Sequence, residues 1–256
     1  MVAVASQPPS SFTAGMSFDQ NFQPLDQCGT PNPFFYHTYE DDFSPYRSTD
    51  YTPTATGTGA GIVGIAGDGG IVQLTSGTTA GVISLQQPFA GFNINVLPKK
   101  TFFLLRMALS AWATAGLTMT FGLIQTTATP GTVTDGVYFT LSAAGVLAIN
   151  SANASAITTV AIPTAAYTFS NNASFDFGIY ITRLGDVLAY VDTQLVGFIP
   201  QSNLGTPNNP QNAGAVARII APSLTTATLN PTVGFTQAGT TAVTAKVDFM
   251  GAFRER

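Results

Sequence analysis

Charge is the scarcest property of this sequence. Charged residues make up 9% of the 256 residues, against about 25% in a typical globular protein. There are three lysines (Lys99, Lys100, Lys246) and two glutamates (Glu40, Glu255). Exposed helix faces are usually built from Glu, Lys and Arg, so this scarcity argues against a helix-rich fold. The nine basic residues are scattered and the net charge is −4. Nucleic-acid binding is therefore not predicted, because it needs a basic stripe.

Residues that carry catalysis or bind metals are equally rare. Cys28 is the one cysteine, which excludes an internal disulfide, and His37 is the one histidine. A Ser-His-Asp or Cys-His arrangement would have to use His37, and no Gly-x-Ser-x-Gly motif is present. The acidic run Glu40–Asp42 has oxygen ligands that suit calcium, but three consecutive acids rarely face one ion. We therefore predict no catalytic residue, no metal site and no cofactor.

Uninterrupted apolar runs are also missing. Residues 101–124 are mostly apolar but contain Arg106, four threonines and two glycines, with a break marked by Ser110 and Gly116. A membrane span tolerates few such interruptions, so we interpret this stretch as two strands. The first ten residues lack a basic region, and their apolar run is too short for a signal peptide. Neither a membrane partner nor export is expected.

Threonine and glycine are abundant in place of charge. Threonine occurs 36 times and glycine 25 times, and these residues favour strands and turns, so the composition predicts an all-β protein. Short apolar or alternating runs follow one another from about residue 60, separated by turn residues, as in a β-sandwich or barrel. The expected strands span residues 71–75, 81–85, 101–109, 117–125, 136–141, 146–149, 156–162, 175–183, 187–191, 195–199, 232–236 and 243–253.

The first 58 residues differ from the rest. They contain seven prolines and little apolar alternation, which predicts an extended, irregular N-terminal arm over residues 1–58 and a sandwich domain over residues 59–256. A disordered tail should be poor in aromatic residues, whereas this segment is rich in them, so we expect it to pack on something. It either folds back on its own domain or reaches a neighbouring subunit. The candidate contacts with a subunit or a capsid are Phe34, Phe35, Tyr36, Tyr39, Phe43 and Tyr46.

One glycine-rich motif has a nucleotide-binding pattern but not the required setting. Residues 59–64 fit Gly-x-Gly-x-x-Gly, which binds phosphate only between a strand and a helix N-terminus. Threonine, proline and glycine precede it, and Gly67–Gly70 follows. We interpret the motif as a linker or turn.

Aromatic residues within the sandwich region have two interpretations. Rings at regular intervals could form a platform on which a sugar stacks, or they could be core and cross-strand pairs, which is the commoner arrangement. The residues concerned are Trp112, Tyr138, Tyr167, Tyr180 and Tyr190.

Three segments together resemble the concanavalin A-like lectin/glucanase jelly roll. They are residues 135–139 (Asp-Gly-Val-Tyr-Phe), 175–180 (Phe-Asp-Phe-Gly-Ile-Tyr) and 187–192 (Val-Leu-Ala-Tyr-Val-Asp). Residues 230–235 and 247–249 also look like the last two strands of that fold. The pattern covers residues 100–256. More narrowly, it is similar to jelly-roll proteins of tailed-bacteriophage structural gene clusters.

The resemblance implies a structural or binding role. Glycosidases of this fold use paired carboxylates, typically two glutamates on one strand. Here Glu40 lies in the arm and Glu255 lies one residue from the end, and neither Asp176 nor Asp192 is in an acid-x-acid array. Asp192 is better explained as a turn residue that bonds nearby backbone amides. We expect no enzyme but a capsid decoration (cement) protein of a phage head, present in the host cytoplasm during assembly. Its expected partners are the major capsid protein and its own copies, with a trimer favoured. The alternative is a carbohydrate-binding module on a tail or fibre.

Overall fold

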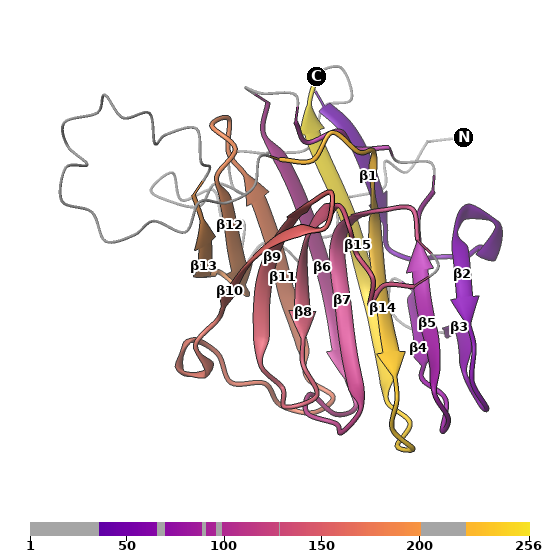
Figure 1. Cartoon of the computed structure of the whole chain (residues 1–256). Coiled ribbons are helices and arrows are strands. Elements are labelled where there is room, and N and C mark those ends of the chain that lie inside the picture. The colour runs from indigo at the N-terminus through magenta and orange to yellow at the C-terminus, as the bar shows by residue number, and fades with distance from the viewer. Residues whose placement is uncertain (1–35, 66–69, 89–90, 96–98, 128, 201–223) are drawn as a thin grey trace.

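The computed structural model shows two antiparallel β-sheets packed face to face (Figure 1). It describes residues 36–65, 70–88, 91–95, 99–127, 129–200 and 224–256. Two 3-10 turns, η3 (Ser48–Asp50) and η4 (Thr164–Ala166), are the helical elements of the described part. Among the described residues, no helix is long and apolar enough to cross a membrane. The predicted all-β sandwich is confirmed.

The first sheet, sheet A, has eight strands, and β1 (Tyr36–Asp41) pairs with its central strand β15. The other strands follow in the spatial order β13 (Gln194–Ile199), β12 (Val187–Val191), β11 (Ser174–Ile181), β6 (Thr101–Leu109), β15 (Thr244–Glu255), β4 (Ile71–Thr75) and β3 (Gly61–Ile65).

The second sheet, sheet B, has seven strands. Their order is β10 (Ala156–Ala161), β9 (Leu147–Asn153), β8 (Gly136–Leu141), β7 (Leu117–Gln125), β14 (Leu229–Gln237), β5 (Gly81–Gln86) and β2 (Thr52–Ala55). The predicted strand pair of residues 101–124 is thus split between the sheets, with β6 in sheet A and β7 in sheet B.

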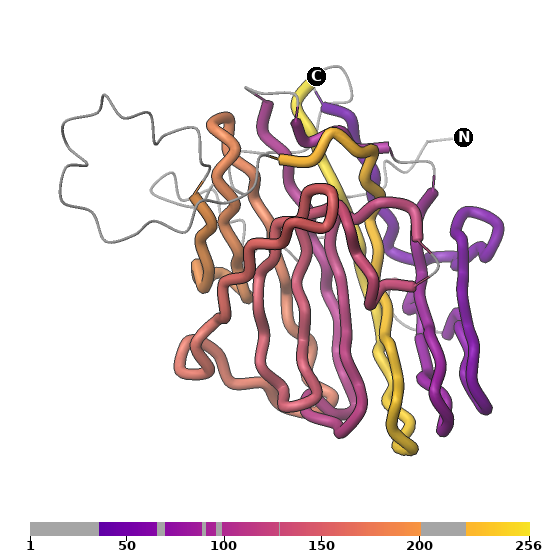
Figure 2. Tube along the Cα trace, viewed as in Figure 1, coloured from indigo at the N-terminus to yellow at the C-terminus, as the bar shows by residue number. Residues whose placement is uncertain are grey.

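The last two strands of the chain occupy central places. In sheet A, β15 lies between β6 and β4, and in sheet B, β14 lies between β7 and β5. Figure 2 shows both strands, in yellow and orange-yellow, running through the middle of the two layers. In each sheet, the strands from the first third of the chain are therefore connected to the other strands by β14 or β15.

The core forms between the sheets because side chains alternate along each strand. In β6, Phe103, Leu105 and Met107 belong to the main core. Their neighbours Phe102 and Leu104 point to the opposite face of sheet A and belong to a separate cluster. This outer cluster also contains Tyr180, Tyr190, Phe249 and Phe253, and each of its six side chains is at most 8% exposed.

Part of the predicted N-terminal arm belongs to the sandwich. Residues 36–41 form β1, whose six residues pair with β15, and residues 52–55 form β2, which pairs with β5. Pro53 is tolerated there because β2 is an edge strand and needs to donate hydrogen bonds on one side only. The predicted boundary between residues 58 and 59 thus falls between two sandwich strands. Residues 1–35 lie outside the described residues.

The interpretation of the glycine-rich motif as a linker or turn is correct at its start and wrong for its remainder, which is a strand. Residues 61–65 form β3, which pairs with β4 along its whole length. Gly57 and Gly59 have φ values of 103° and 79°, which favour glycine, and they lie in the turn that precedes β3. The motif therefore serves a turn and a strand, and it does not open a helix.

Candidate functional site

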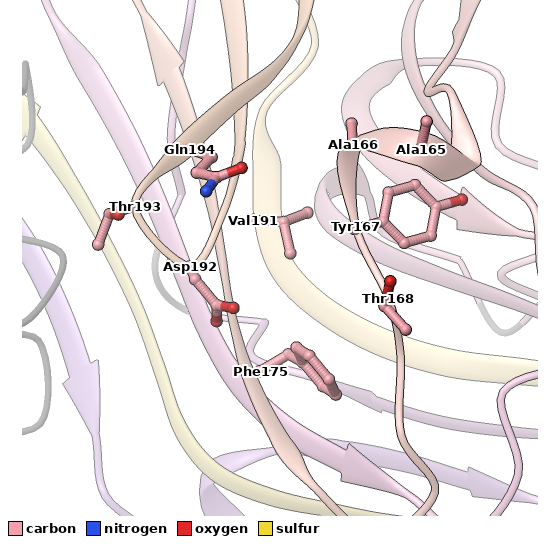
Figure 3. A pocket seen from close by; sticks show the side chains of 9 residues that line it. All are labelled: Ala165, Ala166, Tyr167, Thr168, Phe175, Val191, Asp192, Thr193 and Gln194. Atoms are coloured by element: carbon pink, nitrogen blue, oxygen red, sulfur yellow. The ribbon is translucent and has the colours of Figure 1, made fainter.

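A pocket of about 310 Å³ lies where the β12–β13 turn meets the loop around η4. Figure 3 shows the turn on one side and the loop on the other, with Val191 and Phe175 between them. The nine lining residues are Ala165, Ala166, Tyr167, Thr168, Phe175, Val191, Asp192, Thr193 and Gln194. The pocket thus combines two aromatic rings with carboxylate, amide and hydroxyl groups.

The turn side of the pocket is fixed by Asp192. Val191 and Gln194 pair across β12 and β13, so Asp192 and Thr193 form a two-residue connection. Asp192 has a φ of 52°, which aspartate tolerates better than most residues. The Asp192 N–H donates to the Asp176 carbonyl at 2.6 Å, and the Asp176 N–H donates to Asp192 Oδ1 at 3.1 Å. These bonds join the turn to β11 and confirm Asp192 as a turn residue that bonds a backbone amide.

The loop side is held by aromatic packing. The Tyr167 hydroxyl accepts a hydrogen bond from the Leu147 N–H at 2.9 Å, and its ring lies 4.4 Å from that of Phe169. Phe169 stacks on Trp112 at 4.1 Å, and Phe175 meets Trp112 edge-on at 5.2 Å. Because each ring rests on another, the aromatic side of the pocket is already formed without a ligand.

An ion pair lies behind the turn, on the outer face of sheet A. The Arg106 guanidinium donates from Nε and Nη2 to the two carboxylate oxygens of Asp176, at 2.6 and 2.7 Å. Its Nη1 lies 4.0 Å from Asp248. The hydrogen bond to Asp176 is the main reason that the pKa of Arg106 is raised. Both oxygens of Asp176 are therefore engaged as acceptors.

This arrangement suits the binding of a neutral polar ligand better than chemistry. A retaining glycosidase needs two carboxyl groups about 5 Å apart, one of them able to donate a proton. Asp176 on β11 bonds to Asp192 through its backbone N–H, and Arg106 already holds the Asp176 carboxylate in a bidentate pair. Within the described residues, no group of three or more His, Cys, Asp or Glu side chains is arranged to hold a metal ion.

A second hollow, of about 430 Å³, lies between residues 43–46 of the predicted arm and the end of β3. It is lined by Phe43, Ser44, Pro45, Tyr46, Gly64, Ile65 and Gly70. None of these residues is charged, so the hollow offers few groups that would orient a polar ligand. It is the weaker candidate.

Four of the six predicted contact residues lie within β1 or directly before it in the sequence. Phe34 and Phe35 lie outside the described residues. Tyr36 opens β1 opposite Glu255. The hydroxyl of Tyr39 lies 2.5 Å from that of Tyr51, and burial raises the pKa of Tyr39.

The remaining two contact residues pack within the chain itself. Phe43 is 2% exposed and belongs to the main core. Its ring is therefore not available to a partner, which corrects the expectation that it contacts a subunit. Tyr46 is half-buried and packs against the same core, with its ring 5.8 Å from that of Tyr51.

The five aromatic residues considered as a sugar platform do not form one. Trp112 and Tyr167 pack in or against the main core, Tyr180 and Tyr190 belong to the outer cluster of sheet A, and Tyr138 belongs to a third cluster. Tyr180 stacks on Phe102 at 4.6 Å. The interpretation as core and cross-strand pairs is the better one for this set, and Tyr167 is its one member that lines the pocket.

Comparison with protein families and with curated proteins finds no match. Solved structures do match. A Bacillus licheniformis β-glucanase superposes with a TM-score of 0.52 at 10% identity, over 85% of this chain and 97% of that chain. A native glycosidic hydrolase gives 0.54 at 10% identity, over 86% and 95%. The carbohydrate recognition domain of Emp47p gives 0.52 at 11% identity, over 87% and 98%. At such identities these likenesses concern the fold alone, and that fold is the concanavalin A-like jelly-roll sandwich.

Proposed function

We propose that this chain is a structural protein of a virion, a capsid decoration protein that binds and stabilises a phage head. The observation that carries the proposal is the chemistry of the sheet edges. Of the five strands that have a single pairing partner in the described part, β2, β3, β10 and β13 contain no charged residue, and β1 carries Glu40 and Asp41. Exposed edge strands are normally protected by charges, because they can pair with other chains.

Uncharged edges are suited to burial in an assembly. Moving a charge out of water costs several kcal/mol, whereas apolar surface gains about 25 cal/mol for each Å² buried. A sandwich with four uncharged edge strands therefore fits between capsomers at little desolvation cost along those strands. The proposed partners are the major capsid protein and further copies of this chain, with a trimer favoured.

The N-terminal segment supplies a second means of contact. Thirty-five residues precede β1, which enters sheet A beside β15. A fully extended segment of that length spans at most about 120 Å, so it is long enough to reach a neighbouring subunit. Phe34 and Phe35 are the segment's last two residues.

The test uses virions and a shortened chain. Quantitative mass spectrometry should find this protein at a simple ratio to the major capsid protein. Deleting residues 1–35 leaves every described strand in the chain. The deletion should weaken binding to capsids lacking the protein while the melting temperature stays within about 2 °C of the full chain. A matched control replaces residues 1–35 with a Gly/Ser segment of equal length. Equal capsid binding by all three proteins would refute the role of the segment, and absence from virions would refute the function.

The pocket favours a second candidate, carbohydrate binding on a tail or fibre. Sugars are bound by aromatic faces together with a few polar groups that fix orientation, and Tyr167, Phe175, Asp192 and Gln194 provide both. Binding on a glycan array should be lost in Gln194→Ala and kept in Val63→Thr, whose site lies on β3 at the opposite edge. A glycan signal unaffected by Gln194→Ala would place any sugar binding outside the pocket.

A further inference from the structure

The basic residues are scattered along the sequence, but the fold gathers five of the nine at one end of sheet A. At this end β1 and β6 begin and β11 and β15 finish, and Figure 1 marks it with C. The five residues are Lys99, Lys100, Arg183, Arg254 and Arg256. The described acidic residues of the same end are Asp186 and Glu255. Although the whole chain has a net charge of −4, this end of the sheet is therefore basic.

Arg254 lies on the side of β15 that faces the core. Met250 and Ala252 precede it on this side and belong to the main core, since side chains alternate along a strand. The Nε atom of Arg254 is buried and has no hydrogen-bond partner. Among the described residues, the ion pairs involve Arg106 and Arg183 and not Arg254. Burial lowers the pKa of Arg254, and no opposite charge offsets this effect.

A second polar group without a partner lies directly opposite Arg254. Thr101 is its cross-strand partner in β6, so the two side chains share one face of the sheet. Thr101 is 1% exposed, and its Oγ1 atom has no hydrogen-bond partner. On the other side of Arg254, β1 places His37, whose ring lies 4.8 Å from that of the core residue Phe92. Strand pairing thus sets a guanidinium beside a hydroxyl at the end of the core.

This pair of groups destabilises the fold unless something binds to it. Buried polar groups are nearly always hydrogen-bonded, and those that are not need an explanation. A buried charge without a partner is more costly still. Arginine carries a positive charge and only donates hydrogen bonds, so the ligand that would satisfy it is an anion with acceptor oxygens.

We infer that Arg254 and Thr101 form a binding site for a carboxylate. The planar guanidinium matches the two oxygens of a carboxylate, and the Thr101 hydroxyl can donate a further hydrogen bond to one of them. Arg254 is partly exposed, so a carboxylate can reach it from solvent. A dianionic phosphate fits less well, because Arg183, another arginine of this end, is already held by Glu255 at 2.9 Å. The inference goes beyond the proposed function and holds whether or not the chain occurs in virions.

The test follows the arginine Nε–H signals of the full chain in proton–nitrogen NMR spectra at neutral pH. Acetate, inorganic phosphate and a short polyglutamate peptide are added separately, with the ionic strength kept constant by sodium chloride. The Arg254 signal is identified by its absence from Arg254→Met, and acetate should shift it to a plateau. Thr101→Val should weaken acetate binding about tenfold, because a hydrogen bond to a charged group is lost. The control Lys246→Met removes an exposed cation from the other end of β15 and should bind acetate as the wild type does.

The melting temperature separates a binding role from a structural one. Without ligand, Arg254→Met and Thr101→Val should melt at or above the wild-type temperature, because each removes a polar group that has no partner. Should Thr101→Val fail to fold, Thr101→Ala takes its place. Lower melting temperatures in both variants would show that these groups stabilise the fold, and would overturn the inference.

Three binding results would also overturn the inference. They are an Arg254 signal that acetate does not shift, phosphate binding that is tighter than acetate binding, and a Lys246→Met variant that loses as much affinity as Thr101→Val. Two outcomes support the site and distinguish the sources of the carboxylate. Saturation by polyglutamate at a lower carboxylate concentration than by acetate identifies acidic side chains of a protein, and the reverse order identifies a small carboxylic acid.

Discussion

The turn at Asp192 can be tested by three substitutions that separate its two structural tasks. Asp192 adopts a φ of 52° and accepts a hydrogen bond from the Asp176 N–H. Asp192→Asn keeps both properties, because asparagine tolerates this φ and has a side-chain oxygen. Asp192→Gly keeps the backbone conformation and loses the acceptor. Asp192→Ala loses the acceptor and places a Cβ in the left-handed region.

The expected losses in the free energy of unfolding follow from these differences. A hydrogen bond of this kind contributes about 1 kcal/mol, and a left-handed alanine costs about 1 kcal/mol or more. Glycine avoids that strain, but it increases the entropy of the unfolded chain by the equivalent of about 0.5 kcal/mol. We expect losses near zero for Asp192→Asn, about 1 to 1.5 kcal/mol for Asp192→Gly and about 2 kcal/mol for Asp192→Ala.

Urea unfolding followed by tryptophan fluorescence measures these losses, since Trp112 is 5% exposed and packs in the core. In a chain of this size, 2 kcal/mol corresponds to a fall of about 4 to 8 °C in melting temperature. An Asp192→Ala variant as stable as the wild type would refute the argument. So would an Asp192→Gly variant that is less stable than Asp192→Ala.

Two further predictions concern the core and the response to acid. Phe177 is 1% exposed, and its ring lies 4.9 Å from the ring of Phe121. In urea unfolding, Phe177→Ala should therefore lower the free energy of unfolding by about 3 to 5 kcal/mol and Phe177→Leu by less than about 1.5 kcal/mol. Similar losses for both variants would contradict the packing. The hydrogen bonds donated by the Ala154 N–H and the Thr225 hydroxyl lower the pKa of Asp135. The stabilisation from this lowered pKa is present above the unfolded pKa of about 3.9 and is lost as the pH falls through the folded-state pKa. The stability advantage of the wild type over Asp135→Asn should therefore be full at pH 7 and shrink on acidification below about pH 4, and an advantage that grows on acidification would contradict this sign.

Sequence patterns predicted the strands that bury one or both faces. The alternation in β11 and the apolar runs of β6 and β7 are intrinsic to their residues, and the structure places all three within their sheets. The turn that begins at Asp192, between β12 and β13, was also predictable, because aspartate is common in such turns.

The strands that sequence patterns missed depend on their partners. β1 reads Tyr-His-Thr-Tyr-Glu-Asp and has no apolar alternation. It is a strand because it pairs with residues 250–255 of β15, which lie beyond the pairing of β15 with β4. β3 contains two glycines and is likewise defined by β4. Strand formation at such positions depends on context more than on propensity.

The candidate pocket was only half predictable. Asp192 was identified as a turn residue, but nothing in the sequence indicated that residues 165–168 would lie against the same turn. Tyr167 reaches that position because its hydroxyl binds the backbone of β9 and its ring packs on Phe169. The hydrogen bond joins Tyr167 to a residue 20 positions away, so it arises only in the folded sandwich.

The placement of β14 and β15 has a consequence for the order of events during synthesis. Until these two strands leave the ribosome, β2 to β5 have no pairing that connects them, within either sheet, with β6 to β13. The nascent chain therefore holds two incomplete halves with open edges, and closure of the sandwich must wait for β14 and β15. Pairing over such long separations is slow, so the emerging chain is exposed to wrong partners, including the halves of neighbouring nascent chains. A chaperone that shields β6 and β7 during this interval would raise the yield of folded protein without changing its final stability.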